Sequence, residues 1–333
     1  MSSAIASSAI GLDVGTSRII AAHRQEKDVI CQTQLNAFVT IPFSKLTESV
    51  LRKERIPHLT RDSEITVYGD ESERFANLFH RETRRPMLRG VLNADETSSL
   101  ALVREIVKLL TGGEKGHGQH LCFSVPAAPL GAEEEVRSHE TQLTAMLNEL
   151  GYESRAISEG LAVVYGEMEN SNYTGIGVSC GGGLCNVCLA YLSVPVFSFS
   201  IGKAGDYIDA SVAKLRGEPA TRIRTIKEES FHFNGLFANK IHQALSAFYE
   251  DMIQALVAAL KDTFASVENM PKLSRPVPLV LAGGSVMVPG FRDRFEKTLR
   301  ETELPVAISE VRLGANPMHS TARGALVAAL SEM

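Results

Sequence analysis

Apolar runs alternate with glycine-rich turns in the same order in both halves of the chain. In the first half, β-branched residues flank Gly15-Thr16-Ser17, so residues 10–20 predict two strands joined by a tight turn. Residues 29–34 predict a third strand of the same meander. In the second half, residues 176–200 repeat this pattern around a glycine triplet at 181–183. The repetition predicts a duplicated α/β architecture.

Helical periodicity follows each meander. Apolar residues at helical spacing predict a helix that begins near Asp95, with Asp95 or Thr97 as its N-cap, and ends at 111–113. In the second half, one apolar stripe from Ile241 to Phe264 predicts a long helix. Further strands are expected at 121–126 and 279–282, and further helices at 133–150, 291–299 and 321–330. Residues 38–90 have shorter apolar runs and many charges, which suggests a small inserted subdomain.

Composition sets the class of protein. The 333 residues carry 34 Lys and Arg against 39 Asp and Glu, a formal charge of −5, which gives no global reason to bind nucleic acid. The chain lacks an apolar run of the ~18 residues that a membrane-spanning helix needs. Its Ser/Ala-rich start has no basic region typical of a signal peptide. Five cysteines, an odd number, favour a reducing compartment, so a cytoplasmic location is expected.

The first glycine turn carries candidate chemistry. In Asp13-Val14-Gly15-Thr16-Ser17, glycine allows close backbone approach, hydroxyls and amides can donate to phosphate oxygens, and Asp13 can hold a hydrated divalent cation. The alternative is a plain β-turn with a surface aspartate. The triplet Gly181–Gly183 marks either a second close approach or a mobile hairpin tip. A dinucleotide-binding fingerprint is disfavoured, because Gly181 falls one position too late after Gly175 and Gly177. The first turn lacks the Gly-Lys-Ser/Thr of a P-loop.

Two further groups allow two interpretations each. Glu159 could orient an attacking water beside a phosphate pocket, or simply occupy a capping position at the start of a helix. Cys180, Cys185 and Cys188 have the spacing C-x4-C-x2-C, but apolar packing is favoured over a metal site. The reason is that Cys185 and Cys188 would point to opposite faces of a strand.

The order of the segments is more specific than any one of them. Gly-Leu-Asp-Val-Gly-Thr-Ser comes first, then Ser-Glu-Gly-Leu-Ala-Val-Val-Tyr-Gly, then the glycine triplet. Leu-Ala-Gly-Gly-Ser-Val-Met-Val-Pro-Gly-Phe and Ala-Arg-Gly-Ala-Leu-Val complete the series. Over residues 11–330 the chain resembles the actin-like ATPase superfamily, which includes actin, the seventy-kilodalton heat-shock chaperones and bacterial actins. The pattern is most similar to the bacterial actins MreB and MamK.

This resemblance implies a ribonuclease H-like fold of two lobes with a nucleotide cleft between them. The first lobe would span residues 1–156, with an inserted subdomain at about 38–90, and the C-terminal helix 316–333 would return to it. The second lobe would span 157–315, with a reduced outer subdomain at about 204–265.

The resemblance also implies a role for each matching residue. One phosphate turn would bind ATP or ADP, with Asp13 near Mg²⁺ through water, and the glycine triplet would form the second. Glu159 would position the hydrolytic water, Lys227 would lie near the ribose, and a third turn would hold adenosine. The expected nucleotide-binding residues are Gly11, Asp13, Gly15, Thr16, Ser17, Gly181, Gly182, Gly183, Lys227, Gly283, Gly284 and Ser285.

The chain departs from the superfamily pattern near the second turn. Ser179-Cys180 stands where an Asp is usual, and Leu184 stands where Thr is common. Loss of a carboxylate and a hydroxyl implies that hydrolysis is slowed while nucleotide binding survives. Arg224 occupies a position where many members have a ribose-binding Glu. The short outer subdomain alters the surface that standard filament contacts would use.

The leading hypothesis is therefore an ATP-binding bacterial actin-like protein that self-associates into a cytoskeletal filament or scaffold, with weak ATPase activity. The alternatives are a chaperone- or reactivase-like nucleotide switch, a pseudo-ATPase scaffold, and a sugar or acetate kinase, although no acceptor pocket is evident. The sequence does not decide between ATP and GTP.

Overall fold

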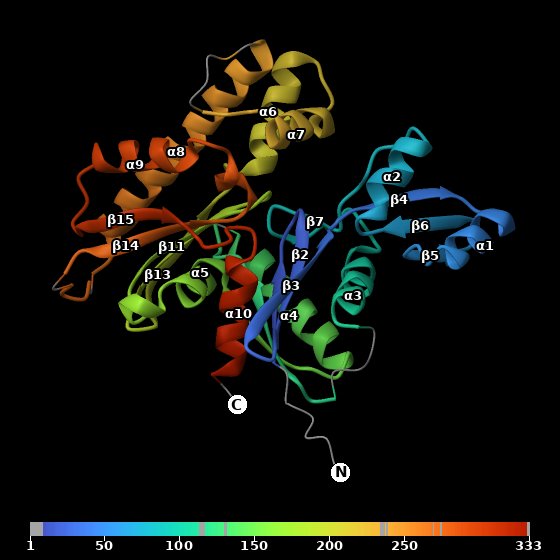
Figure 1. Ribbon diagram of the computed structural model, residues 1–333, viewed down its shortest axis with the longest axis horizontal. Coiled ribbons are helices and arrows are strands. Elements are labelled where there is room, and N and C mark those ends of the chain that lie inside the picture. Colours follow the sequence, from blue (N-terminus) through green and yellow to red (C-terminus); the bar gives the residue numbers. More distant parts are fainter. Residues whose placement is uncertain are drawn as a thin grey trace.

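Two five-stranded sheets of the same topology form the framework of the protein (Figure 1). The computed structural model describes residues 9–112, 117–129, 132–233, 237, 239–268, 270–273 and 275–331, so most of the N-terminal segment discussed above lies outside it. In the first sheet, ordered β3-β2-β1-β9-β10, an antiparallel meander continues into two parallel strands. These strands are β1 (Ile10–Val14), β2 (Arg18–Gln25), β3 (Asp28–Leu35), β9 (His120–Val125) and β10 (Glu153–Ser158).

The second sheet repeats this arrangement. Its order is β13-β12-β11-β14-β15, again a meander followed by two parallel strands. The strands are β11 (Gly175–Cys180), β12 (Cys185–Tyr191), β13 (Val194–Ile201), β14 (Val277–Ala282) and β15 (Ile308–Leu313). The repeated order confirms the duplicated α/β architecture.

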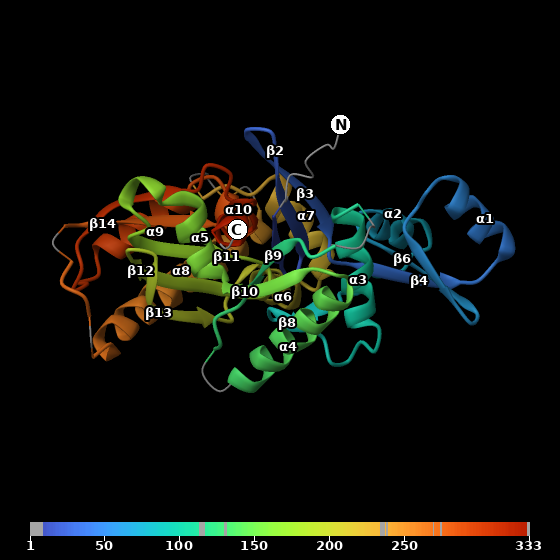
Figure 2. The same cartoon turned by 90° about the horizontal axis from the view of Figure 1, so that it is seen from below.

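Helices cover both sheets and fill the space between them (Figure 2). The first sheet carries α3 (Ser99–Leu110) and α4 (Glu133–Glu149), and the second carries α8 (Lys240–Ser266) and α9 (Phe291–Arg300). Between the sheets, α5 (Glu159–Glu167) packs on β11 and β12, whereas α10 (Ser320–Leu330) packs on β1 and β9; the two helices contact each other. We call the first sheet with α3, α4 and α10 the first lobe, and the second sheet with α5 to α9 the second lobe.

Each lobe bears an outer part, which lies at the edge of the molecule in Figure 1. In the first lobe it is a small sheet, β4-β6-β5, with its own apolar core. Its elements are β4 (Phe38–Pro42), α1 (Lys45–Lys53), β5 (His58–Arg61), β6 (Glu64–Tyr68) and α2 (Glu71–Leu78). A short ribbon of β7 (Met87–Leu88) and β8 (Val91–Leu92) leads back to the sheet. In the second lobe the outer part consists of α6 (Gly205–Arg216), α7 (Ala220–Glu229) and the start of α8.

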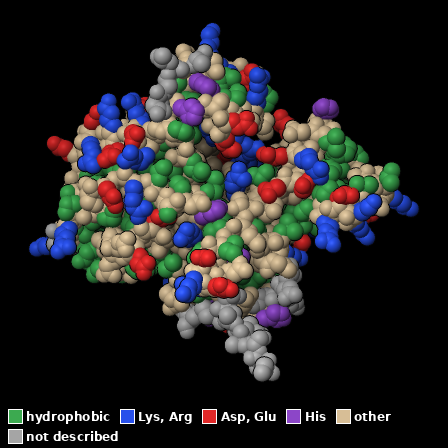
Figure 3. Space-filling model, viewed as in Figure 1, with side chains coloured by type: hydrophobic (Ala, Val, Ile, Leu, Met, Phe, Trp, Pro, Cys, Tyr) green, Lys and Arg blue, Asp and Glu red, His purple; other side chains and the backbone are tan. Residues whose placement is uncertain are grey.

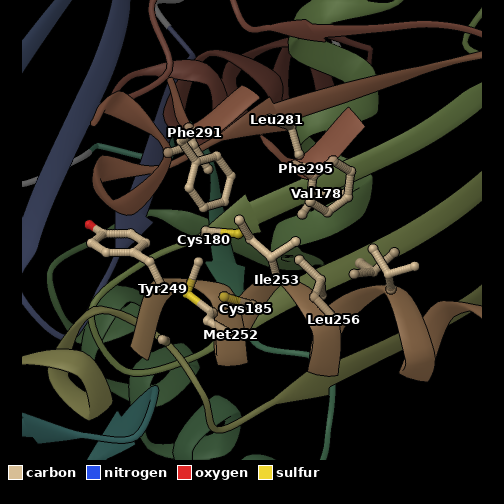
Figure 4. Close-up of a cluster of buried hydrophobic side chains, with 14 of the residues drawn as sticks. Val178, Cys180, Cys185, Tyr249, Met252, Ile253, Leu256, Leu281, Phe291 and Phe295 are labelled. Carbon is tan, nitrogen blue, oxygen red and sulfur yellow. The ribbon is translucent and has the colours of Figure 1, made fainter. Parts of the chain in front are cut away.

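The largest apolar core belongs to the second lobe and lies directly behind the glycine triplet. Figure 4 shows Cys180 and Cys185 among Met252, Ile253 and Phe291. The two cysteines are direct partners across β11 and β12, and they flank the turn at its base. This packing anchors the turn rigidly at both ends.

One helix start differs from the expectation. The helix predicted from Asp95 begins at Ser99. Asn93 explains the delay, because its side-chain oxygen accepts the Asp95 amide at 3.1 Å and its carbonyl accepts the Ser99 hydroxyl at 2.8 Å. These bonds hold residues 93–98 in turns rather than helix. None of the helices in the described ranges has the length and apolarity to cross a membrane.

Candidate nucleotide site

The two glycine turns meet at one cavity of about 320 Å³ between the lobes. Figure 3 shows the hollow from outside, with acidic and basic side chains around its edge. The cavity brings together nearly all of the predicted site residues. Those that line it are Asp13, Gly15, Thr16, Ser17, Glu159, Gly181, Gly182, Gly183, Lys227, Gly283, Gly284 and Ser285.

The tips of the two turns are in direct contact. A Cβ atom on Gly182 would overlap the Ser17 hydroxyl, and one on Gly183 would overlap the Thr16 hydroxyl and lie 2.7 Å from the Gly90 amide nitrogen. Thr16 is itself held, since its hydroxyl accepts the Gly90 amide at 2.9 Å. Only glycine at these positions therefore lets the lobes approach this closely.

Asp13 lies at the end of β1 on the first-lobe side of the cavity. Its Oδ1 accepts the Ser124 hydroxyl at 2.7 Å, and that hydroxyl oxygen accepts the Val14 amide at 3.1 Å. Burial raises the pKa of Asp13 to about 6, although the Ser124 hydrogen bond opposes the rise. The side chain is thus oriented in a site where a counter-charge would stabilise its ionised form.

Glu159, the first residue of α5, is the second carboxylate of the cavity. Its Oε2 accepts the Ser179 hydroxyl at 3.0 Å. Burial and the nearby Asp13 charge raise its pKa to about 8, against the opposing effects of the Ser179 and Asn186 side chains. Of the two carboxyls, Glu159 holds its proton more strongly. The alternative interpretation, in which Glu159 only caps the start of α5, does not explain why it lies beside Asp13. Ser158, the N-cap of α5, makes no side-chain capping bond.

The second-lobe end of the cavity rests on a buried ion pair. Lys227 donates to Asp209 at 2.8 Å and to the Gly205 carbonyl at 3.2 Å, and the Lys and Asp side chains are each only 7% exposed. The Ser285 hydroxyl donates to the Gly181 carbonyl at 2.9 Å. This bond links the third turn to the glycine triplet, so two of the three turns form one unit.

Gly11 is the predicted residue that the structure does not bring to the cavity. A Cβ at Gly11 would overlap the Ala322 carbonyl and the Leu326 amide of α10. The close packing of α10 against β1 therefore explains why residue 11 is a glycine. The cysteines are likewise packing residues: Cys188 lies on the α5 face of its sheet, and Cys180 and Cys185 lie on the opposite, core face.

Sequence reasoning missed several charged residues of the cavity. Arg18, Asp206, Asp209 and Glu228 line it, as does Arg224, which was noted only as a departure. Arg85 of the first lobe donates to both carboxylate oxygens of Asp206 at 2.7 and 2.8 Å across the cleft. Arg18 could have been found, because it directly follows the first turn. The Arg85–Asp206 pair could not, because 121 residues separate its members.

Solved structures share this fold over almost the whole chain. A MamK double helical filament has 19% sequence identity and a TM-score of 0.71, covering 98% of this chain and 99% of that one. MreB5 of Spiroplasma citri bound to AMPPNP has 14% identity and a TM-score of 0.65, covering 95% and 94%. The ethanolamine utilization protein EutJ from Carboxydothermus hydrogenoformans has 14% identity and a TM-score of 0.57, covering 96% and 88%. At these identities the likeness shows the fold.

Comparison with curated proteins found no match. These solved structures confirm the fold that the resemblance to the bacterial actins MreB and MamK implied. A family model described as Volactin matches residues 8–329, nearly the full length. The chain belongs to the Volactin family.

Proposed function

We propose that this protein binds ATP in the cleft between its lobes and assembles into a cytoskeletal filament or scaffold, hydrolysing the nucleotide slowly. The observation that carries the proposal is the convergence of two glycine turns and two buried carboxylates on one cavity. The similar MamK structure is a filament, and the similar MreB5 structure holds AMPPNP, which supports the proposal. We further propose a division into lobes at residues 156 and 157, with α5 and α10 as the hinge.

The turns supply what a polyphosphate requires. Gly15 and the triplet Gly181–Gly183 allow close backbone approach from opposite lobes, and Ser17 adds a hydroxyl. Because each lobe contributes one turn, a ligand held by both resists separation of the lobes. Nucleotide binding is thereby coupled to the angle between the lobes and to any assembly contact that spans both of them.

The carboxylates fit a magnesium ion. Within the described residues no group of three or more His, Cys, Asp or Glu side chains is placed to hold a metal by itself. Mg²⁺ is commonly held by one or two carboxylates, with water and substrate phosphates as the other ligands, and Asp13 with Glu159 matches that donor set. Mg²⁺ would supply neutralisation of phosphate charge. Burial keeps Glu159 mostly protonated at neutral pH, with a pKa of about 8; ionised beside the positive charge of a bound Mg²⁺, it would be suited to accept a proton from the attacking water.

Titration calorimetry and sedimentation test the proposal together. We expect heat on mixing with ATP and Mg²⁺, pelleting that depends on ATP, and filaments in electron micrographs. Asp13→Ala should bind ATP at least about tenfold more weakly, because it removes a buried charged contact. Absence of ATP binding, or equal affinity of Asp13→Ala, would contradict the nucleotide site. A nucleotide-bound monomer at all concentrations would contradict assembly and favour the nucleotide-switch alternative.

Ser179 is the observation behind slow hydrolysis. It presents a hydroxyl to Glu159 where an acidic side chain is usual in the superfamily. Ser179→Asp should raise the rate of phosphate release, whereas the uncharged, similarly shaped Ser179→Asn should not. Equal rates in both variants would show that the missing carboxylate does not limit turnover, and would favour a pseudo-ATPase scaffold.

A further inference from the structure

The cationic side chains that line the cavity differ in whether an acidic side chain neutralises them. Three line it: Arg18, Arg224 and Lys227. Lys227 is neutralised by Asp209, and Arg224 forms an ion pair with Glu73 of the small sheet's α2. The Arg18 side chain makes no hydrogen bond or ion pair with any residue of the described ranges. It is the one cavity cation in those ranges that is left without an acidic partner.

The position of Arg18 in the backbone also directs its side chain toward the cavity. It is the first residue of β2, and its carbonyl accepts the Gly15 amide at 3.0 Å, which closes the first turn. Ile19 points into the first-lobe core, whereas Ile20 lines the cavity. Because side chains alternate along a strand, Arg18 shares the face of Ile20 and opens onto the cavity.

The acidic side chains of the cavity mean that a bound polyanion needs a positive charge beside it. Five acidic residues line the cavity: Asp13, Glu159, Asp206, Asp209 and Glu228. Asp206 is compensated by Arg85, and Asp209 by Lys227. Of the remaining acids, Asp13 and Glu228 would repel a polyanion unless a positive charge faced it, and Glu159 would do so whenever it is ionised. A bound cation at the carboxylates and Arg18 are the two sources of that charge.

We propose that Arg18 contacts the polyphosphate of the bound nucleotide and makes affinity depend on the number of phosphates. This inference rests on the proposed nucleotide site and adds a residue that the superfamily resemblance did not assign. A guanidinium donates in a fixed planar fork that suits phosphate oxygens, and its contact strengthens as the ligand gains charge. Arg18 thus favours ATP and ADP over AMP and adenosine.

Calorimetry with a ligand series tests this role. Wild type, Arg18→Gln and Arg18→Lys are each titrated with ATP, ADP, AMP, adenosine and inorganic tripolyphosphate in the presence of Mg²⁺. Arg18→Gln should weaken ATP and ADP about 10- to 100-fold, abolish tripolyphosphate binding and leave adenosine affinity unchanged. Arg18→Lys should recover part of the loss. The matched control is Arg24→Gln, because Arg24 is exposed on the same strand and away from the cavity.

Each outcome decides the inference. Equal weakening of ATP binding and adenosine binding in Arg18→Gln would mean that Arg18 only supports the fold of the turn. Unchanged ATP affinity would mean that Arg18 does not contact the ligand. Either result overturns this inference without contradicting the proposed nucleotide site. Failure of the wild type to bind any of the five ligands would overturn the proposed function as well. Melting temperatures of the three proteins within about 2 °C of one another would show that folding is not the cause of the change.

Discussion

Two of the regions where the lobes contact each other, the hinge and the mouth of the cleft, have opposite character. At the hinge, α5 and α10 touch backbone to backbone: a Cβ on Gly324 would overlap the Ala162 carbonyl, and Ala162 and Ala322 are fully buried. At the mouth, the contacts are two ion pairs, Arg85–Asp206 and Arg224–Glu73, whose side chains are between 20% and 41% exposed.

The difference shows where the molecule can move. Close backbone contacts cannot slide without steric overlap, so the hinge fixes the axis about which the lobes turn. Part-exposed ion pairs are weakened by water and salt, so they contribute little to the barrier against opening. A ligand between the glycine turns acts close to the mouth, where small contact energies control the angle between the lobes.

The hinge is the region where a single methyl group should have the largest effect. Gly324→Ala places a Cβ against the Ala162 carbonyl, and neither helix can yield without losing its packing. We expect a loss of about 3 kcal/mol or more in the free energy of unfolding, measured by urea denaturation. Gly202→Ala is the control, since no atom lies within 4 Å of a Cβ there. Similar stability of both variants would contradict a rigid hinge.

The turns lie between hinge and mouth, and Gly183→Ala should open the cleft there. Its Cβ would press on Thr16 and on the Gly90 backbone, both in the opposite lobe. We expect a loss of about 2 kcal/mol, a larger radius of gyration in X-ray scattering and loss of ATP binding. Gly181→Ala, in the same turn, is the control for stability and radius of gyration and should change neither, because its nearest contact, the Leu184 carbonyl, lies 3.5 Å away. An unchanged radius for Gly183→Ala would mean that the turns need not touch.

The carboxylates at the cavity should make stability depend on pH. The pKa of Glu159 is about 8 in the folded protein and near 4.5 when it is exposed. Between these values the unfolded chain has lost the proton that the folded protein keeps, so rising pH favours unfolding. Asp13, raised to about 6, acts in the same direction at lower pH. From pH 5 to 8 the wild type should therefore lose at least about 1 kcal/mol relative to Glu159→Gln, in paired urea titrations. Parallel pH curves would show that Glu159 ionises normally.

The comparison of hinge and mouth also separates what the sequence could predict from what it could not. Local patterns located the turns at Gly15 and Gly181–Gly183, because glycine between β-branched runs constrains its own neighbourhood. They misplaced the start of α3, where Asn93 competes for backbone groups, and they grouped Gly11 with the ligand although it faces α10. Local patterns could not predict the contacts at the mouth, since its ion pairs join residues that are 121 and 151 positions apart in the sequence.

The mouth should give the smallest effect on stability and the largest dependence on salt. Glu73→Gln removes the charge that holds Arg224, at a cost of roughly 0.5 kcal/mol because the pair is part-exposed. In X-ray scattering without nucleotide, the wild-type radius of gyration should increase as NaCl is raised, while the variant should start near the high-salt value and change little. Glu48→Gln, which breaks the exposed Arg52–Glu48 pair within α1, is the control and should behave as the wild type. If Glu73→Gln keeps the wild-type response to salt, the cleft is closed by its turns alone, and the mouth has no part in setting the angle between the lobes.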